Sequence, residues 1–199
     1  PIQKEAIPAI LSQRDVIAIA QTGTGKTASF SLPILHLLAT TQKPQAHGIR
    51  ALIIVPTREL AAQVADNVDK YSQNLNVRST AVFGGVRIEP QKFALEKGVD
   101  ILIATPGRLV DLYEQGAINF ENLEILVLDE ADRMLDLGFI DHIHHIQSLL
   151  PEKRQTLLFS ATFSKEIRAL TTAMLRNPMT IELATAQDHI DNITQILHP

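Results

Sequence analysis

Residues 20–27 read Ala20-Gln21-Thr22-Gly23-Thr24-Gly25-Lys26-Thr27, and this stretch decides the fold of the chain. It follows the apolar run Val16–Ile19, which is typical of a buried strand, and it precedes a mixed apolar segment that is typical of a helix. A strand, a glycine-rich turn and Gly-Lys-Thr at the start of a helix together predict a phosphate-binding loop. The sequence therefore indicates an α/β protein that binds a nucleoside triphosphate.

The residue types in this loop match what an anion requires. Glycine lets consecutive backbone N–H groups turn toward one phosphate, and the helix start adds partial positive charge. Lys26 is expected to be exposed to solvent and to reach the terminal phosphates, and Thr27 is expected to hold Mg²⁺. Ala20 stands where the usual pattern begins with glycine, so the closest approaches to a ligand are expected at Gly23 and Gly25. The alternative is a glycine-rich turn with an ordinary surface lysine. The predicted nucleotide ligands of the loop are Gln21, Thr22, Gly23, Thr24, Gly25, Lys26 and Thr27.

Two acidic residues end a second apolar run. Asp129 and Glu130 follow Ile125–Leu128, whose continuous apolar character is typical of a strand buried on both faces. Open α/β sheets bind their ligands at the carboxyl ends of their strands. We therefore expect Asp129 to hold Mg²⁺, partly through water, and Glu130 to orient or deprotonate an attacking water molecule, with Lys26 as the third catalytic residue. Taken alone, the pair is also compatible with solvated acids that end a strand.

Apolar runs recur along the chain, with helical patterns between most of them. Such alternation predicts crossover units and a mostly parallel sheet. The expected strands are 15–20, 51–55, 78–83, 100–104, 125–129, 156–160 and, with a weaker pattern, 179–183, and helical examples are 59–71, 108–115, 140–150 and 165–175. The predicted fold is an α/β three-layer sandwich with helices on both faces of the sheet.

Composition limits the class of protein. The 199 residues are 45% hydrophobic, which is enough for one sizeable core. Cysteine is absent, which excludes disulfides and cysteine metal sites and fits a reducing, cytoplasmic location. No apolar run reaches membrane-spanning length. The net charge of −4 counts mildly against binding nucleic acid by bulk charge alone. Pro1 and His198-Pro199 are unlike natural chain ends, so the sequence resembles an excised piece.

Seven short motifs follow one another along the whole chain. They are Ile2-Gln3, the loop at 20–27, Pro56-Thr57-Arg58-Glu59-Leu60-Ala61, Gly84-Gly85, Thr105-Pro106-Gly107-Arg108, Asp129-Glu130-Ala131-Asp132 and Ser160-Ala161-Thr162. With this ordered set, the chain resembles the DEAD-box RNA helicases, and most of all their bacterial members. The resemblance implies the first of that family's two RecA-like domains over residues 1–183. It also implies that residues 184–199 begin a linker to a second RecA-like domain.

The resemblance implies ATP and Mg²⁺ as cofactors and gives Gln3 a role. Gln3 ends what resembles the Q motif, which reads adenine in this family, because an amide offers both a donor and an acceptor to the base edge. The alternative is a glutamine at a helix start that points to water. The aromatic residue that stacks on adenine in the family lies upstream of this motif and is not in the sequence.

Three motifs at expected strand ends are the candidate RNA contacts. Backbone N–H groups and two arginines at one sheet edge suit a phosphate backbone, and none of these motifs contains an aromatic residue for base stacking. We therefore expect sequence-independent contacts to a single RNA strand. Residues 56–59 also make a good helix start, so capping is the alternative there. The predicted contact residues are Pro56, Thr57, Arg58, Gly84, Gly85, Thr105, Gly107 and Arg108.

Asp132, Ser160 and Thr162 are the candidate coupling residues. In the family, the Ser-Ala-Thr motif hydrogen-bonds to the DEAD segment and links hydrolysis to strand separation. Small hydroxyls also commonly cap or turn a strand end, and no base partner marks either hydroxyl as a nucleophile. The histidines at 142, 144 and 145 have no third metal ligand in evidence, so a solvated helix face is favoured over a metal site.

Together the motifs predict the ATP-binding domain of an ATP-dependent RNA helicase. In this family two domains close over ATP·Mg²⁺ and RNA, and the second domain supplies arginine fingers, so this domain is expected to be nearly inactive alone. The rival function is a binding module, namely an ATP-gated RNA clamp or scaffold, which the motifs do not separate from a helicase. A DNA translocase is disfavoured by the DEAD and Ser-Ala-Thr motifs together. No membrane association is expected, and the sequence does not identify protein partners.

Overall fold

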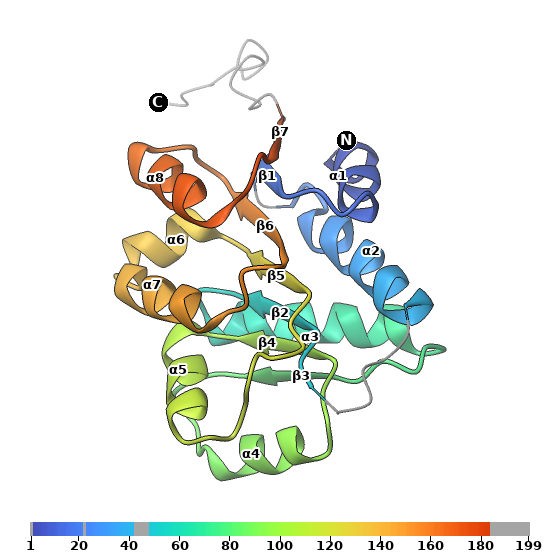
Figure 1. The fold of residues 1–199 in the computed structure, drawn as a ribbon, viewed down its shortest axis with the longest axis vertical. Helices are drawn as coiled ribbons and strands as arrows, with labels where there is room; N and C mark the ends of the chain where they lie inside the picture. Colours follow the sequence, from blue (N-terminus) through green and yellow to red (C-terminus); the bar gives the residue numbers. More distant parts are fainter. Residues whose placement is uncertain (1, 22, 42–47, 184–199) are drawn as a thin grey trace, which may run out of the picture.

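The computed structural model describes residues 2–21, 23–41 and 48–183 (Figure 1). Thr22 of the predicted loop and the linker predicted at 184–199 lie outside the described residues. In chain order the elements are α1 (Ile2–Leu11), β1 (Val16–Ile19), α2 (Lys26–Thr40), β2 (Ala51–Ile54), α3 (Arg58–Ser72), β3 (Ser79–Val82), α4 (Glu89–Glu96), β4 (Ile101–Ala104), α5 (Pro106–Glu114), β5 (Ile125–Leu128), α6 (Ala131–Asp136), α7 (Ile140–Leu149), β6 (Gln155–Ser160), α8 (Lys165–Met174) and β7 (Met179–Glu182).

The strands form one seven-stranded sheet in the order β3-β4-β2-β5-β6-β1-β7. Every strand pairing among the described residues is parallel, which confirms the predicted sheet. Each strand end lies within one residue of its predicted position, and the ends of the four predicted helices lie within two. Apolar runs located the strands because both faces of this sheet are covered.

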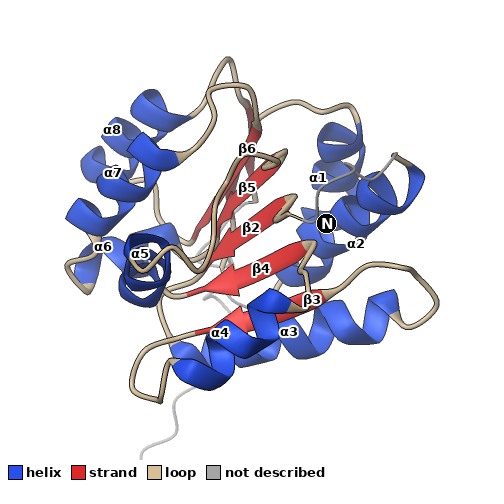
Figure 2. Ribbon diagram, turned by 60° about the horizontal axis from the view of Figure 1, so that its bottom comes forward, coloured by secondary structure: helices blue, strands red, loops and turns tan. Residues whose placement is uncertain are grey.

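Helices cover both faces of the sheet and make the predicted three layers (Figure 2). Successive side chains of a strand point to opposite faces, so Val16 and Ala18 of β1 join the core beneath α1, α2 and α3. Ile17 and Ile19 of the same strand join the core beneath α5 to α8. Phe30 of α2 packs on Phe159 of β6 with ring centroids 5.2 Å apart. This packing fixes α2, and with it the loop at its start, over the centre of the sheet.

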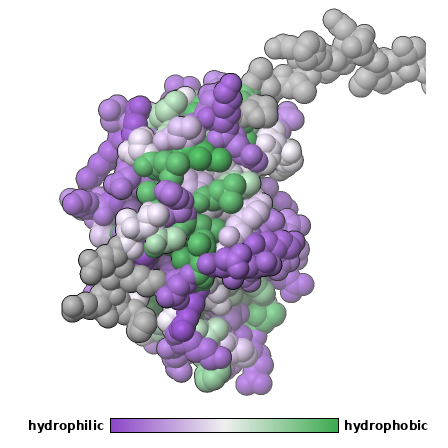
Figure 3. Space-filling model, turned by 90° about the vertical axis from the view of Figure 1, so that its right-hand side faces the viewer, coloured by the Kyte–Doolittle hydropathy of each residue, from purple (hydrophilic) through white to green (hydrophobic). Residues whose placement is uncertain are grey.

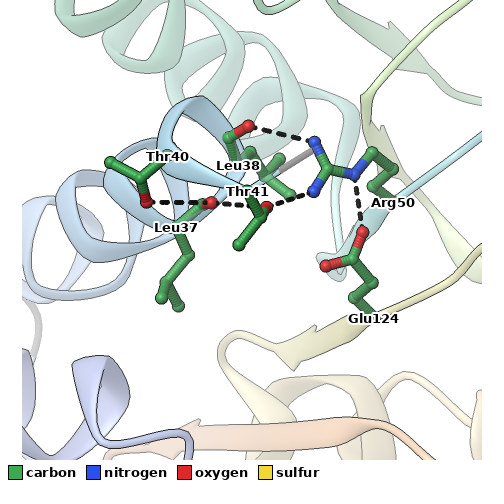
Figure 4. Close-up of polar contacts among 6 residues, drawn as sticks. All are labelled: Leu37, Leu38, Thr40, Thr41, Arg50 and Glu124. Atoms are coloured by element: carbon green, nitrogen blue, oxygen red, sulfur yellow. Dashed lines mark hydrogen bonds and ion pairs between the residues drawn. The ribbon is translucent and has the colours of Figure 1, made fainter. Parts of the chain in front are cut away.

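A buried arginine fixes the far end of α2 (Figure 4). Arg50 is 1% exposed. Its Nε lies 2.6 Å from Oε1 of Glu124, its Nη1 donates to the carbonyl of Leu38 at 3.0 Å, and its Nη2 donates to Oγ1 of Thr41 at 2.5 Å. A guanidinium at a helix C-terminus satisfies free carbonyls and complements the helix dipole. Arg50 therefore ties the end of α2 to the starts of β2 and β5, a contact that the sequence did not predict.

The outer surface of α1 and α2 carries apolar side chains as well as polar ones. Leu11 is 38% exposed and Leu32 is 41% exposed. Figure 3 shows the face that lies on the right in Figure 1. Apolar side chains form a band down the middle of this face, with hydrophilic side chains around it. Exposed leucines are ordinary on protein surfaces. Within the described ranges, no helix is both long enough and apolar enough to cross a membrane.

Candidate functional site

The parallel strands bring the predicted motifs to one edge of the sheet, and the strand order sorts them into two groups. Strands β1, β6 and β5 are adjacent and lead into the phosphate loop, the Ser-Ala-Thr motif and the DEAD segment. Strands β2, β4 and β3 are adjacent and lead into the motifs at 56–61, 105–108 and 84–85. The candidate nucleotide residues and the candidate RNA residues therefore occupy separate halves of the same edge.

The loop after β1 has the backbone that its glycines predict. Gly23 and Gly25 have φ values of 83° and 87°, which glycine adopts without strain. A Cβ at Gly25 would lie 2.6 Å from Nε2 of Gln3, while one at Gly23 would meet nothing within 4 Å. Gly25 is therefore closely approached by another part of the protein, and the close approach of a ligand to Gly23 and Gly25 stays a prediction. Thr24 Oγ1 donates to the carbonyl of Gln21 at 2.8 Å and closes the turn.

Lys26 is buried, so the expectation that it is exposed to solvent is wrong. The residue is 7% exposed, and its Nζ is buried without a hydrogen-bond partner. An ammonium group in that position is costly unless an anion compensates it. Lys26 lies at the first position of α2, where the helix dipole also favours an anion. The loop thus holds a buried ammonium group without a hydrogen-bond partner at the place predicted for phosphate.

Asp129 lies beneath this lysine and is only 3% exposed. Burial raises the pKa of Asp129 to about 6, while the positive charge of Lys26 acts in the opposite direction. The carboxyl group is therefore mostly ionised at neutral pH, without a hydrogen bond to Lys26. Its Oδ1 accepts from the N–H of Glu130 at 3.0 Å. A buried carboxylate beside the loop is a suitable ligand for a divalent cation.

Glu130 has an unusual backbone conformation. Its φ of 52° and ψ of 50° lie in the left-handed region, and it is the N-cap of α6. Non-glycine residues in this region carry strain and cluster at functional sites. The side chain is 15% exposed, and its Oε2 lies 3.3 Å from Nη1 of Arg133. Glu130 lines the same cavity as Gly23, Gly25 and Lys26 of the loop.

One cavity of about 460 Å³ unites these groups. It is lined by Gln3, Gly23, Gly25, Lys26, Thr27, Ala28, Leu60, Gln63, Asn67, Tyr71, Asp129 and Glu130. A cavity of about 430 Å³ lies at the opposite edge of the sheet, so size alone does not identify a nucleotide site. The ammonium without a hydrogen-bond partner, the two acids and the glycine turn make the cavity of about 460 Å³ the candidate site. Gln3 lines this cavity, and its Nε2 donates to the carbonyl of Gly25 at 3.4 Å.

The DEAD segment and the Ser-Ala-Thr motif are joined by hydrogen bonds, as the family resemblance implied. Oδ2 of Asp132 accepts from the N–H groups of Ala161 and Thr162, both at 3.1 Å, and from Oγ1 of Thr162 at 3.2 Å. Ser160 is fully buried, and its hydroxyl oxygen accepts from the N–H of Thr162 at 3.4 Å. Asp132 and Thr162 form the direct link between the two motifs, and Ser160 contributes a hydrogen bond to the backbone of Thr162.

The two arginines of the candidate RNA half have different surroundings. The Arg58 side chain is 59% exposed, with its Nε 3.0 Å from Oε1 of Glu59. The Arg108 side chain is 10% exposed, with its Nε 3.6 Å from Oδ2 of Asp111. Its Nη2 donates to the carbonyl of Val86 at 2.9 Å, and its Nη1 is buried without a partner. Arg58 is thus exposed where a ligand can reach it, whereas Arg108 is folded back onto the loop after β3.

The remaining residues of this half cap helices or lie in the loop. Oγ1 of Thr57 accepts from the N–H of Leu60 at 3.2 Å, so the predicted helix start at 56–59 is confirmed. Thr105 is the N-cap residue of α5, which begins at Pro106, but its side chain makes no capping bond. Gly84 and Gly85 are exposed. Their backbone groups therefore lie at the surface, where a ligand can reach them.

Comparison with known proteins places this geometry in a family. The family model described as DEAD/DEAH box helicase matches residues 1–170 of the chain.

The chain belongs to the DEAD/DEAH box helicase family.

Relatives of this DEAD/DEAH box protein match nearly the whole chain. It is 45% identical over 195 residues to the DEAD-box ATP-dependent RNA helicase RhpA of Helicobacter pylori, which covers 98% of this chain and 39% of RhpA. The solved structure of the yeast DEAD-box splicing factor Prp28 matches with a TM-score of 0.88 and 34% identity, over 93% of this chain and 45% of that one. The solved structure of a DEAD box protein from Methanococcus jannaschii matches with a TM-score of 0.85 and 38% identity, over 95% of this chain and 50% of that one. The RecA-like fold is confirmed, and the chain spans between two fifths and one half of these relatives.

Sequence reasoning missed one wall of the cavity in this DEAD/DEAH box domain. Leu60, Gln63, Asn67 and Tyr71 of α3 line it opposite the loop. They follow one another at intervals of three and four residues, which places them on one side of a helix. Since the helix itself was predicted, this spacing could have indicated that the four side chains form one wall of a site.

The histidines of α7 have a simple structural setting. His142 packs edge-on against Phe139 with ring centroids 5.8 Å apart. Across residues 2–21, 23–41 and 48–183, no group of three or more His, Cys, Asp or Glu side chains is arranged to hold a metal ion. The Mg²⁺ ligands predicted at Thr27 and Asp129 would need oxygen atoms from phosphate and water to complete a shell.

Proposed function

We propose that this chain is the ATP-binding first domain of an ATP-dependent RNA helicase, which couples ATP hydrolysis to the unwinding of RNA duplexes. The observation that carries the proposal is the cavity in which the unpaired Lys26 ammonium faces Asp129 and Glu130. The direct bonds from Asp132 to Thr162 support coupling beyond simple hydrolysis. The relatives named ATP-dependent RNA helicases support the substrate and the reaction.

The residues of the cavity fit ATP·Mg²⁺. The loop N–H groups and Lys26 would hold the phosphates, Thr27 and Asp129 would hold Mg²⁺, and Gln3 at the rim would read the adenine. When bound, Mg²⁺ neutralises charge on the phosphates and orients them for attack. Glu130 then orients a water molecule and takes its proton. The orphaned Nζ of Lys26 is the feature of this chain that a triphosphate would satisfy.

RNA binding is proposed for the other half of the sheet edge. The contact residues are those predicted at 56–58, 84–85, 105 and 107–108, acting on the phosphates and sugars of one strand. We propose that a second RecA-like domain closes over this edge and supplies arginine fingers, which contribute roughly 10³–10⁵ to the rate in enzymes of this kind. The single domain should therefore hydrolyse ATP very slowly.

A duplex-unwinding assay with the intact two-domain protein tests this function. ATP-dependent release of a short RNA strand, together with RNA-stimulated ATP hydrolysis, is the expected result. ATP-dependent RNA binding without strand release would instead support an RNA clamp or scaffold. The cytoplasmic location and the domain limits at residues 1–183 remain predictions from the sequence.

Replacement of both Ser160 and Thr162 by Ala should separate the two activities of the intact protein. The change removes the Thr162 hydroxyl that donates to Asp132 and the Ser160 oxygen that supports it. Losing these two bonds is expected to reduce unwinding roughly tenfold while leaving RNA-stimulated ATP hydrolysis nearly intact. Strand-release and phosphate-release rates are measured on the same preparation. Ser148→Ala with Thr172→Ala is the matched control, and equal loss of both activities would indicate a folding defect instead.

The two arginines should also differ in their contribution to RNA binding. Removing either is expected to weaken binding about uniformly across RNA sequences. On single-stranded RNA, the salt slope falls by roughly 0.7 for each phosphate that the protein no longer neutralises. Replacement of the exposed Arg58 should give the full decrease in the salt slope, and replacement of the folded-back Arg108 should give a smaller decrease. The measurement is a salt titration of Arg58→Ala, Arg108→Ala and the control Arg14→Ala on two unrelated RNAs with a non-hydrolysable ATP analogue. A sequence-selective loss would contradict backbone recognition.

A further inference from the structure

The loop that carries Gly84 and Gly85 leaves the sheet at its edge. Strand β3 is the first in the strand order and pairs only with β4 among the described residues. The last ladder bond runs from the N–H of Thr105 to the carbonyl of Val82. Beyond Val82 no strand holds the chain, so the position of the two glycines must depend on other contacts.

Gln91 supplies the first of these contacts. Its Oε1 accepts from the N–H of Phe83 at 3.1 Å, and its Nε2 donates to the carbonyl of Phe83 at 3.1 Å. One amide thus pairs with both backbone groups of one residue, as a neighbouring strand would. Gln91 lies in the first turn of α4, a helix that has no buried residue. The amide is therefore a main attachment between this helix and the end of β3.

Arg108 holds the loop on its other side. Its Nη2 donates to the carbonyl of Val86 at 2.9 Å, and its own side chain is nearly buried. The two glycines lie between these anchors at 83 and 86. Gly85 has a φ of 79°, which requires glycine. No hydrogen bond from the N–H of Gly84 or Gly85 occurs within the described residues, so both donors are available to a ligand.

We propose that Gln91 is a positioning residue for RNA binding. Its amide, acting with Arg108 through the loop between them, holds the free N–H groups of Gly84 and Gly85 in the orientation that a phosphate requires. A loop fixed in advance loses less conformational freedom when RNA binds, and so binds more tightly. The inference rests on the proposed function, because it assigns a role within the same RNA-binding edge.

The test compares Gln91→Met with wild type in the intact protein. Methionine keeps the length of the side chain and removes both bonds. With single-stranded RNA and a non-hydrolysable ATP analogue, RNA affinity should fall about tenfold, as expected for the loss of one to two hydrogen bonds. Because Gln91 carries no charge, the salt slope should not change. Nucleotide affinity, and the ATP hydrolysis rate at saturating RNA, should equal those of wild type. Gln73→Met, an exposed glutamine at the end of α3, is the matched control.

A second readout reports on the loop itself. Hydrogen exchange at the N–H of Phe83 should accelerate in Gln91→Met, while the unfolding temperature stays near that of wild type. Combining Gln91→Met with Arg108→Gln should weaken RNA binding by less than the product of the two single effects, because both side chains hold one loop. If Gln91→Met does not fold, Gln91→Ala, which also removes both bonds and adds no charge, takes its place in the same comparison.

The outcomes separate this inference from the proposed function. Wild-type RNA affinity in Gln91→Met, despite faster exchange at Phe83, would overturn the inference and leave the RNA helicase proposal standing. A changed salt slope would also overturn it, because Gln91 would then act through charged contacts. A wild-type protein that binds no RNA in any nucleotide state would overturn both.

Discussion

Lys26→Ala is expected to abolish detectable nucleotide binding while leaving the fold intact. The ammonium of Lys26 is the buried cation that a triphosphate would pair with, and the charge-assisted bonds it would make contribute about 1.5–3 kcal/mol each. Losing two of them corresponds to a decrease of at least about a hundredfold in affinity. Nζ has no hydrogen-bond partner in the structure, although its charge favours the ionised form of Asp129. Because no hydrogen bond within the protein is lost, the variant should still fold, with an unfolding temperature near that of wild type.

Titration calorimetry with ATP and ADP measures this effect. Lys4→Ala, an exposed lysine on α1, controls for the loss of one positive charge. A Lys26→Ala protein that folds normally and binds ATP with unchanged affinity would remove the loop from the nucleotide site. A variant that fails to fold would show that the buried ammonium has a structural partner in solution.

Glu130→Gln in the intact protein should retain ATP and RNA binding and lose turnover. Glutamine keeps the shape of the side chain and an oxygen for Arg133, but its amide does not accept a proton from water. General-base catalysis by a positioned side chain contributes about 10²–10⁴ to the rate, and the loss should be of that size. The variant should accumulate with ATP and RNA bound, because both ligands still bind and ATP hydrolysis is blocked.

Single-turnover hydrolysis and equilibrium RNA binding, measured together, separate these effects. Glu121→Gln, in the exposed segment before β5, is the matched control. Near-normal turnover in Glu130→Gln would remove this residue from the mechanism. Weakened ATP binding in the same variant would show instead that Glu130 organises the site before any chemistry occurs.

The parts of the fold that sequence analysis predicted are those that depend on local pattern. Val16–Ile19 and Ile125–Leu128 are continuous apolar runs because both faces of their strands are buried. The functional residues follow these runs, so a parallel sheet places them at one edge without further information. Strand order is different, because it depends on how helices and connections pack. The separation of the candidate nucleotide residues from the candidate RNA residues could therefore not be predicted from the motifs.

Side-chain environments were also beyond sequence reasoning. Lysine side chains are mostly exposed in folded proteins, yet Lys26 is 7% exposed. Arg58 and Arg108 both follow strands in similar motifs, yet Arg58 is exposed and Arg108 is folded onto the loop after β3. Arg50 precedes β2 and belongs to none of the seven motifs, yet it is buried and hydrogen-bonded to the end of α2. Each outcome depends on tertiary neighbours that are distant in sequence.

The strand order also sets the sequence of events during synthesis of the chain. Strand β1 is synthesised before the other described strands and pairs only with β6 and β7 among them, so it finds its partners last. Until residues 155–160 have emerged, Val16–Ile19 is an apolar segment with both edges unpaired. Such a segment is prone to pair with other chains, and long-range parallel pairing is slow. The phosphate loop directly follows this strand, so the nascent domain should gain its nucleotide site only at the end of folding, when ATP can no longer guide the earlier steps.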